Sequence, residues 1–292
     1  MSDASQKKEA AFWSADENNA VRCGLCPHRC LVRENASGAC GVRENREGKL
    51  IASSYGQISS VALDPIEKKP LYMFNPGKKI LSIGGFGCNM KCGFCQNYEI
   101  SSEYESIRQR AGLLSPDDVV EAALRAVPDG NIGVAYTYNE PLIGYEFLYD
   151  CAALARSKGL SNVLVTNGCI NAEPLENLLP LTDAMNIDLK GFTDDFYTGV
   201  GGDLETVKET IKRASASCHV EVTTLVLPGE NEGDIPEIAK WLSSIDPGIP
   251  LHLTRFFPRY HYDGRQPTPR ETIMRLCEAA KEHLTNVFPG NM

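Results

Sequence analysis

Three cysteines in the run GFGCNMKCGFCQN are the residues with the clearest chemical potential. Cys88, Cys92 and Cys95 are separated by three and then two residues, and the next cysteine downstream is Cys151. Three thiolates can hold three irons of a [4Fe–4S] cluster, which ordinarily takes four cysteines. A cluster with three protein ligands leaves one iron open, and an open metal position can bind a substrate. The spacing therefore predicts a reactive cluster rather than a closed one.

A second group of cysteines precedes this run. Cys23, Cys26, Cys30 and Cys40 supply four thiols within a short stretch, with His28 as a spare ligand. In a chain without an apolar signal core, such a group indicates metal ligands rather than disulfides. Four sulfurs that close a short loop suit either structural Zn²⁺ or a second iron–sulfur cluster, and the spacing leaves both open.

The composition limits the class of protein. The chain has 292 residues, a net charge of −9 and eleven cysteines. An acidic chain with no basic face is not expected to bind nucleic acid generally. The N-terminus is polar, and no apolar run approaches the roughly 20 residues of a membrane span. We therefore expect a cytoplasmic protein. Cys151 and Cys277 lie in helical patterns and are expected to be small core residues, and Cys169 is left unassigned.

The chain divides into two parts at the turn Phe74-Asn75-Pro76-Gly77. Residues 1–75 have short apolar patches and turn residues, which predicts a small cysteine-rich extension held together by metal. In residues 76–292, short strand patterns alternate with helical ones. The expected strands are KILSIGG, NIGVAYT, NVLVTNG, AMNIDLKG, HVEVTTLVL and LHLTRFF, which begin at residues 79, 131, 162, 184, 219 and 251.

Helices are expected between these strands. One begins at Ser115-Pro116, where serine can cap and proline suits the first turn. Another covers about residues 141–157 and stops at Gly159, and the last covers about 268–283. Six strands alternating with helices predict an α/β fold with a parallel sheet, a partial (β/α)6 TIM-like barrel. A doubly wound sheet is the alternative that periodicity does not exclude.

Polar residues follow every expected strand. Functional side chains of barrels gather at the carboxyl ends of strands, so these positions form a test independent of the cysteines. They include the cluster run itself, Tyr138-Asn139-Glu140, Thr166-Asn167-Gly168, Asp188-Leu189-Lys190, Leu227-Pro228-Gly229-Glu230-Asn231-Glu232, and His252 with Arg255.

With these motifs in order, the chain resembles the radical S-adenosylmethionine (SAM) superfamily. Within it, the chain is similar to the pyruvate formate-lyase activating enzyme branch, and most closely to the radical SAM component of the AmmeMemoRadiSam group. The segments that carry the resemblance are CGLCPHRC…GACGVR, DPIEKKPLYMFNPG, GFGCNMKCGFCQN, TYNEP, TNG and RFFPRY, which together span most of the chain.

The resemblance implies a role for each motif. Glu140, with Asn139, stands where the superfamily usually has GGE, and its carboxylate would accept the SAM amine. The implied SAM-binding residues are Phe94, Asn139, Glu140, Thr166, Asn167, Asp188, Lys190, Leu227, Gly229 and Glu232. Phe94, Leu227 and Gly229 would pack near the adenine, and Lys190 would face a carboxylate.

Structural alternatives exist for the same residues. Glu140 could simply cap the helix that starts at Pro141. Asp188 and Lys190 point to one face of a strand and could form an ion pair with no further role. His252 on a strand is more often hydrogen-bonded structure than a catalyst.

The implied reaction is reductive cleavage of SAM at the cluster, giving methionine and a 5′-deoxyadenosyl radical that abstracts hydrogen from a substrate. An electron donor such as flavodoxin or ferredoxin is then required. The substrate is either a protein, as for activases of glycyl radical enzymes, or a small molecule, with Memo-like and AMMECR-like partner proteins. A third hypothesis, from another class, is a non-catalytic iron–sulfur or zinc protein used for electron transfer or binding.

Overall fold

The structure, a computed structural model, describes residues 8–292; residues 1–7, part of the expected extension and of the polar N-terminus, lie outside the described part. An eight-stranded sheet dominates it, in the order β15-β14-β13-β12-β11-β10-β8-β7. The strands are β7 (Ser60–Pro65), β8 (Lys79–Gly84), β10 (Asn131–Tyr136), β11 (Ser161–Thr166), β12 (Ala184–Asp188), β13 (His219–Val226), β14 (Leu251–Arg255) and β15 (Val287–Gly290). From β8 to β15, neighbouring strands are parallel.

This order confirms the expected α/β fold and all six expected strands. The strands follow the chain without the reversal of a doubly wound sheet, so the architecture is that of an open, partial barrel. Two strands of this sheet were not expected. β15 adds a seventh parallel strand, and β7 pairs antiparallel with β8 although it lies within residues 1–75. We therefore propose that the boundary between the two parts lies before Ser60 rather than near residue 75.

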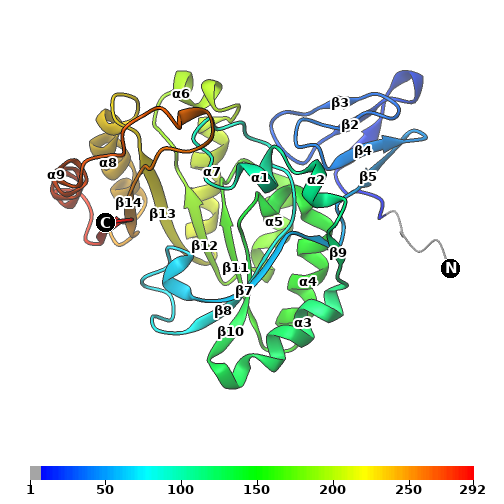
Figure 1. The fold of residues 1–292 in the computed structure, drawn as a ribbon, viewed down its shortest axis with the longest axis horizontal. Helices are drawn as coiled ribbons and strands as arrows, with labels where there is room; N and C mark the ends of the chain where they lie inside the picture. The colour runs from blue at the N-terminus through cyan, green and yellow to red at the C-terminus, as the bar shows by residue number, and fades with distance from the viewer. Residues whose placement is uncertain (1–7) are drawn as a thin grey trace.

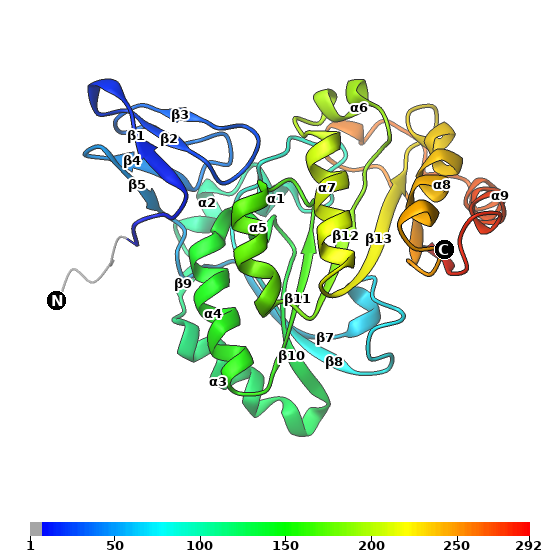
Figure 2. The same ribbon diagram turned by 180° about the vertical axis from the view of Figure 1, so that it is seen from behind.

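Helices cover the outer face of the sheet, where Figure 2 shows α4, α5 and α7. The helices are α1 (Tyr98–Ser101), α2 (Glu105–Arg108), α3 (Pro116–Arg125), α4 (Tyr145–Ser157), α5 (Ala172–Leu178), α6 (Asp194–Gly199), α7 (Leu204–Ser215), α8 (Ile235–Ile245) and α9 (Arg270–Lys281). Ser115 and Asp118 form the capping box that starts α3. The longest helix, α4, has 13 residues, and none within residues 8–292 is long and apolar enough to cross a membrane.

The strands before β7 lie in small antiparallel sheets, one of which is completed by β9 from further along the chain. β1 (Trp13–Ala15), β2 (Val21–Cys23) and β3 (Leu31–Val32) form one sheet; β4 (Arg43–Arg46) pairs with β5 (Lys49–Ala52), and β6 (Gln57–Ile58) pairs with β9 (Gly112–Leu113). Figures 1 and 2 both show β2 to β5 beside α1 and α2, at the end of the molecule away from α8 and α9. A buried ion pair, Arg43 Nη1 to Glu146 Oε1 at 2.9 Å, joins β4 to α4.

A buried carboxylate fixes the loop between β7 and β8. Glu221 accepts hydrogen bonds from the amides of Tyr72 (3.0 Å) and Met73 (2.7 Å). The ring nitrogens of His252 and His219 lie 2.6 and 2.9 Å from its oxygens. Burial acts to raise the pKa of Glu221, but these hydrogen bonds lower it to about 2. The contacts of His252 therefore fit a hydrogen-bonded structural role rather than a catalytic one.

Candidate active site

A cavity of about 390 Å³ opens at the carboxyl edge of the sheet. This is the edge at which functional residues of barrels gather, and the size suits a small ligand. Residues from the cluster loop and from the ends of successive strands line it together: Cys88, Met90, Cys92, Phe94, Cys95, Asn139, Glu140, Thr166, Asn167, Asp188, Lys190, Thr223, Leu225 and Thr254 among them. The structure thus brings most of the expected site residues to one place.

The three cysteines of the cluster loop reach this cavity as free thiols. The Met90 amide donates a hydrogen bond to Cys88 Sγ (3.3 Å), and Asn167 Nδ2 lies 3.7 Å from the same sulfur. Burial raises the pKa of the Cys88 thiol and raises that of Cys92 to about 11. Since thiolates are the ligands of iron, loading a cluster here must release protons.

The three thiols have the donor type that a [4Fe–4S] cluster takes, and all three line one cavity. A cubane takes each thiolate on a different iron, so its ligands need not converge on one point. The donor set, three sulfurs beside a cavity rich in polar groups, suits a cluster with an accessible iron.

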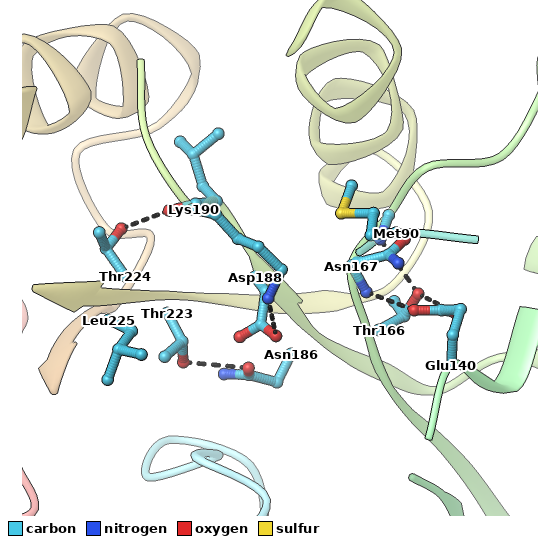
Figure 3. A network of polar contacts seen from close by, with 12 residues as sticks. Met90, Glu140, Thr166, Asn167, Asn186, Asp188, Lys190, Thr223, Thr224 and Leu225 are labelled. Atoms are coloured by element: carbon cyan, nitrogen blue, oxygen red, sulfur yellow. Dashed lines mark hydrogen bonds and ion pairs between the residues drawn. The ribbon is translucent and has the colours of Figure 1, made fainter. Parts of the chain in front are cut away.

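Glu140 organises one side of the cavity (Figure 3). Its carboxylate accepts hydrogen bonds from Thr166 Oγ1 (2.6 Å), the Asn167 amide (2.7 Å) and the Leu142 amide (3.0 Å). The hydrogen bond from the Leu142 amide caps the 3-10 turn Pro141–Gly144. Glu140 therefore has the capping role that the structural alternative gives it. Three donors occupy a group that can accept about four, which leaves room for one more donor. An ammonium group of a ligand meets that requirement.

Because burial raises the pKa of Glu140 to about 7, ligand binding at this carboxylate should depend on pH. Below about pH 7 the carboxyl is largely neutral and attracts an ammonium weakly; above it the group is ionised. We expect the affinity for SAM to rise between about pH 6 and about pH 8. Calorimetric titration of reconstituted protein measures this rise. Glu140→Gln should bind SAM more weakly and flatten the dependence, and an unchanged slope in that variant would assign the titration to another group.

Asp188 and Lys190 form an ion pair across the cavity from Glu140, with Lys190 Nζ 3.0 Å from Asp188 Oδ2 (Figure 3). Burial acts against the charge of Lys190, yet the nearby Asp188 carboxylate and Cys92 thiol raise its pKa. The lysine is therefore a stable cation next to Cys92, an expected cluster ligand. Its charge suits both a negatively charged cluster and a ligand carboxylate.

Asn139 and Phe94 also line the cavity, the first held by hydrogen bonds and the second by aromatic packing. Asn139 Oδ1 accepts from the Gly85 amide (2.8 Å), and its Nδ2 donates to Gly87 O (3.1 Å). It thereby fixes the segment that leads into Cys88. Phe94 is buried, with its ring edge-on to Tyr262 at a centroid distance of 5.7 Å.

Three expected residues are not among those that line the cavity: Leu227, Gly229 and Glu232. Leu227 is fully buried in the core, and its amide donates to Asn231 Oδ1 (2.7 Å). Gly229 takes a positive φ of 76° in the turn that follows β13. These contacts shape the loop before α8, and a role toward adenine stays a prediction.

Sequence reasoning missed the side chains that the segment DPIEKKP brings to the cavity. Lys68 and Lys69 line it beside Tyr138. Lys69 Nζ lies 2.8 Å from Asp64 Oδ2 and 4.5 Å from the centre of the Tyr138 ring, and the Tyr138 hydroxyl donates to the same oxygen (2.7 Å). Tyr138 has a φ of +72°, which few non-glycine residues adopt. The adjacent lysine pair is visible in the sequence, but its position at the cavity depends on the pairing of β7 with β8, which no local pattern indicates.

Comparisons with known proteins agree with this site. The sequence profile of the Radical SAM superfamily matches residues 82–242. The chain is 41% identical over 291 residues to the uncharacterized protein MJ0808 of Methanocaldococcus jannaschii, covering 98% of this chain and 85% of that protein. It is 23% identical over 207 residues to pyruvate formate-lyase 1-activating enzyme of Escherichia coli K12, covering 65% and 83%. The structure of QueE from Escherichia coli matches with a TM-score of 0.53 at 16% identity, covering 82% of this chain and 95% of that one.

An open, mostly parallel α/β sheet with three thiols at its carboxyl edge defines a radical SAM type of protein. The chain belongs to the Radical SAM superfamily, and its relatives include a pyruvate formate-lyase activating enzyme. Membership implies a [4Fe–4S] cluster and SAM as cofactors.

Proposed function

We propose that the chain is an activase-like radical SAM enzyme, with Cys88, Cys92 and Cys95 holding the [4Fe–4S] cluster. The observation that carries this proposal is the convergence of these thiols and the Glu140–Thr166–Asn167 group on one cavity. When bound, the cluster would supply the electron for reductive cleavage of SAM to methionine and a 5′-deoxyadenosyl radical. Glu140 would hold the ammonium of SAM, and Lys190 its carboxylate. Flavodoxin or ferredoxin would supply the electron, in the cytoplasm.

The test is anaerobic reconstitution with iron and sulfide, followed by dithionite and SAM. We expect 5′-deoxyadenosine in the product mixture by liquid chromatography and mass spectrometry. If a fully loaded protein forms none, the non-catalytic hypothesis, an iron–sulfur or zinc protein for electron transfer or binding, replaces this one. This test needs no deuterated substrate, because cleavage of SAM in the absence of the substrate also releases 5′-deoxyadenosine.

A second candidate is an enzyme that modifies a small molecule alongside Memo-like and AMMECR-like partners of the AmmeMemoRadiSam group. Lys68 and Lys69 favour it, because they belong to the DPIEKKPLYMFNPG segment that carries that resemblance and they line the cavity. Deuterium transfer decides between the two substrates. Label moving from a deuterated glycyl peptide into 5′-deoxyadenosine supports the activase; label moving only from small molecules supports the second candidate.

The four N-terminal cysteines are proposed as a second metal site. Cys23, Cys26 and Cys40 are buried, and Cys30 is partly buried. The expected spare ligand, His28, has Nε2 at 2.7 Å from Asn89 O, which engages this nitrogen with the cluster loop. This contact leaves Nδ1 of His28 available, so the proposed donor set is four thiols with the imidazole as a spare ligand.

A further inference from the structure

The loop between β7 and β8 holds two lysines, Lys68 and Lys69, at the wall of the active-site cavity. Ile66 and Leu71, on either side of them in the chain, are fully buried and pack in one apolar cluster with residues of β8, β10, β11 and β12. The carbonyl oxygen of Pro70 accepts a hydrogen bond (2.8 Å) from an asparagine side chain of β12. The core therefore fixes the position of the lysine pair, which does not depend on a free surface loop.

The two ammonium groups share one carboxylate. Lys69 Nζ lies 2.8 Å from Asp64 Oδ2, and Lys68 Nζ lies 3.3 Å from Asp64 Oδ1. Both lysines line the cavity, whereas Asp64 is not among the lining residues. Lys69 is 3% exposed, and burial lowers its pKa although Asp64 opposes that shift, so a further anion beside Lys69 would be stabilising. This wall of the cavity therefore carries an excess of positive charge.

Tyr138 lies over Lys69 in a backbone conformation that is unfavourable for tyrosine, with a φ of +72°. Its carbonyl oxygen accepts from Asn97 Nδ2 (2.8 Å), and its hydroxyl donates to Asp64 Oδ2 (2.7 Å). A Cβ atom placed on Gly84 would lie 2.9 Å from the Tyr138 ring, so the absence of a side chain there makes room for it. Strain of this kind persists where the surroundings fix it, and it concentrates at binding sites.

The proposed SAM site accounts for the other lysine and carboxylate side chains of the cavity. Those that line it are Lys68, Lys69, Glu140, Asp188 and Lys190. Glu140 would take the ammonium of SAM, and Lys190, paired with Asp188, would take its carboxylate. Lys68 and Lys69 then remain as cations that SAM does not use, although they line the same cavity.

We propose that Lys68 and Lys69 bind a carboxylate or phosphate group of a small-molecule substrate, which occupies the cavity together with SAM. The inference rests on the proposed cleavage of SAM at the Cys88 loop, and it specifies the substrate class of the second candidate function. Lysine ammonium groups bind either anion as point charges. The cavity volume of about 390 Å³ is near the lower end for ligand sites, so it suits a small molecule beside SAM better than a protein loop.

Calorimetric titration tests this site, with inorganic phosphate, succinate and neutral glycerol as probes. The protein is the reconstituted chain saturated with SAM, so that Lys190 is already occupied. We expect at least one of the two anions to bind once per chain and glycerol not to bind. A preference for phosphate indicates a phosphorylated substrate, and a preference for succinate indicates a carboxylated one. Glycerol binding as tightly as the anions, or binding of neither anion, would overturn the inference.

Two variants assign the anion to the lysine pair. Lys68→Gln changes an exposed side chain and should weaken anion binding about tenfold, as expected for the loss of a hydrogen bond from a charged group. Lys69→Met with Asp64→Asn removes the buried pair without leaving one charge alone, and should weaken binding at least as much. Lys158→Gln is the matched control, because Lys158 is exposed and does not line the cavity, and it should keep the wild-type affinity.

The outcome for Lys68→Gln decides the assignment even where the double variant does not fold, which circular dichroism establishes. Equal anion affinities in the wild-type chain and Lys68→Gln would contradict the inference. If the cluster-loaded chain forms no 5′-deoxyadenosine but binds an anion through these lysines, the proposed function fails and the anion site stands. If the chain cleaves SAM but binds neither anion, the anion site alone fails.

Discussion

Cys88→Ala is expected to reduce SAM cleavage to background. Cys88 is one of only three sulfurs proposed to hold the reactive cluster, and two thiolates do not retain a cubane with one open iron. Its sulfur also contacts Asn167 Nδ2, which belongs to the group around Glu140, so the loss removes a ligand from the centre of the cavity. The measurement is 5′-deoxyadenosine formed per chain after anaerobic reconstitution, together with the iron retained.

Cys218→Ala is the matched control for this variant. Cys218 lies before β13, is partly buried, and is not among the residues that line the cavity. It should keep both the iron and the 5′-deoxyadenosine of the wild-type chain. Unchanged cleavage by Cys88→Ala would remove the basis of the proposed function, whereas equal losses in both variants would point to general damage by cysteine replacement.

Arg43→Ala should lower the free energy of unfolding by about 3–5 kcal/mol, because it leaves the Glu146 carboxylate buried without its partner. The two side chains are 2% and 4% exposed, and Glu146 Oε1 also accepts from the Ala11 amide (2.7 Å). Urea unfolding followed by circular dichroism measures the change. The exposed pair Arg125–Glu121 supplies the control, since Arg125→Ala should cost no more than about 0.5 kcal/mol.

A double variant separates the buried charge from lost packing. Arg43→Met with Glu146→Gln removes both charges and keeps an acceptor for the Ala11 amide. We expect it to recover much of the stability lost in Arg43→Ala. A double variant as unstable as Arg43→Ala would mean that the packing of the arginine, rather than its charge, joins the N-terminal sheets to α4.

Local patterns account for the part of the fold that was predicted. The six predicted strands of the barrel are apolar runs bounded by turn residues. The start of α3 is likewise local, because Ser115 caps the helix by hydrogen bonds with Asp118 and Pro116 occupies its first turn. Cys151 and Cys277 are buried in helices as expected. The polar residues after each strand converge because parallel strands end at one edge, so Glu140, Thr166 and Lys190 could be assigned to one site before any coordinates.

Long-range pairing accounts for what was missed. β15 ends in Pro289-Gly290, a poor strand pattern that is acceptable only because it lies at an edge of the sheet. The sequence pattern places β7 in the extension, because its antiparallel pairing with β8 depends on the tertiary structure. Because β7 belongs to the sheet, Lys69 reaches the cavity, and no local sequence pattern could indicate this position.

The amino-acid sequence by itself determined which ligands are available. It supplies three thiols whose spacing predicts a cluster with one open iron, four more thiols upstream, and the strands that present the site. Spacing and periodicity are local properties, and ligand type follows from residue type. The tertiary structure alone decided that Cys40 packs on Gly87 and that His28 reaches the carbonyl oxygen of Asn89. These contacts join segments about 50 or more residues apart, and their meeting depends on the packing of the whole core.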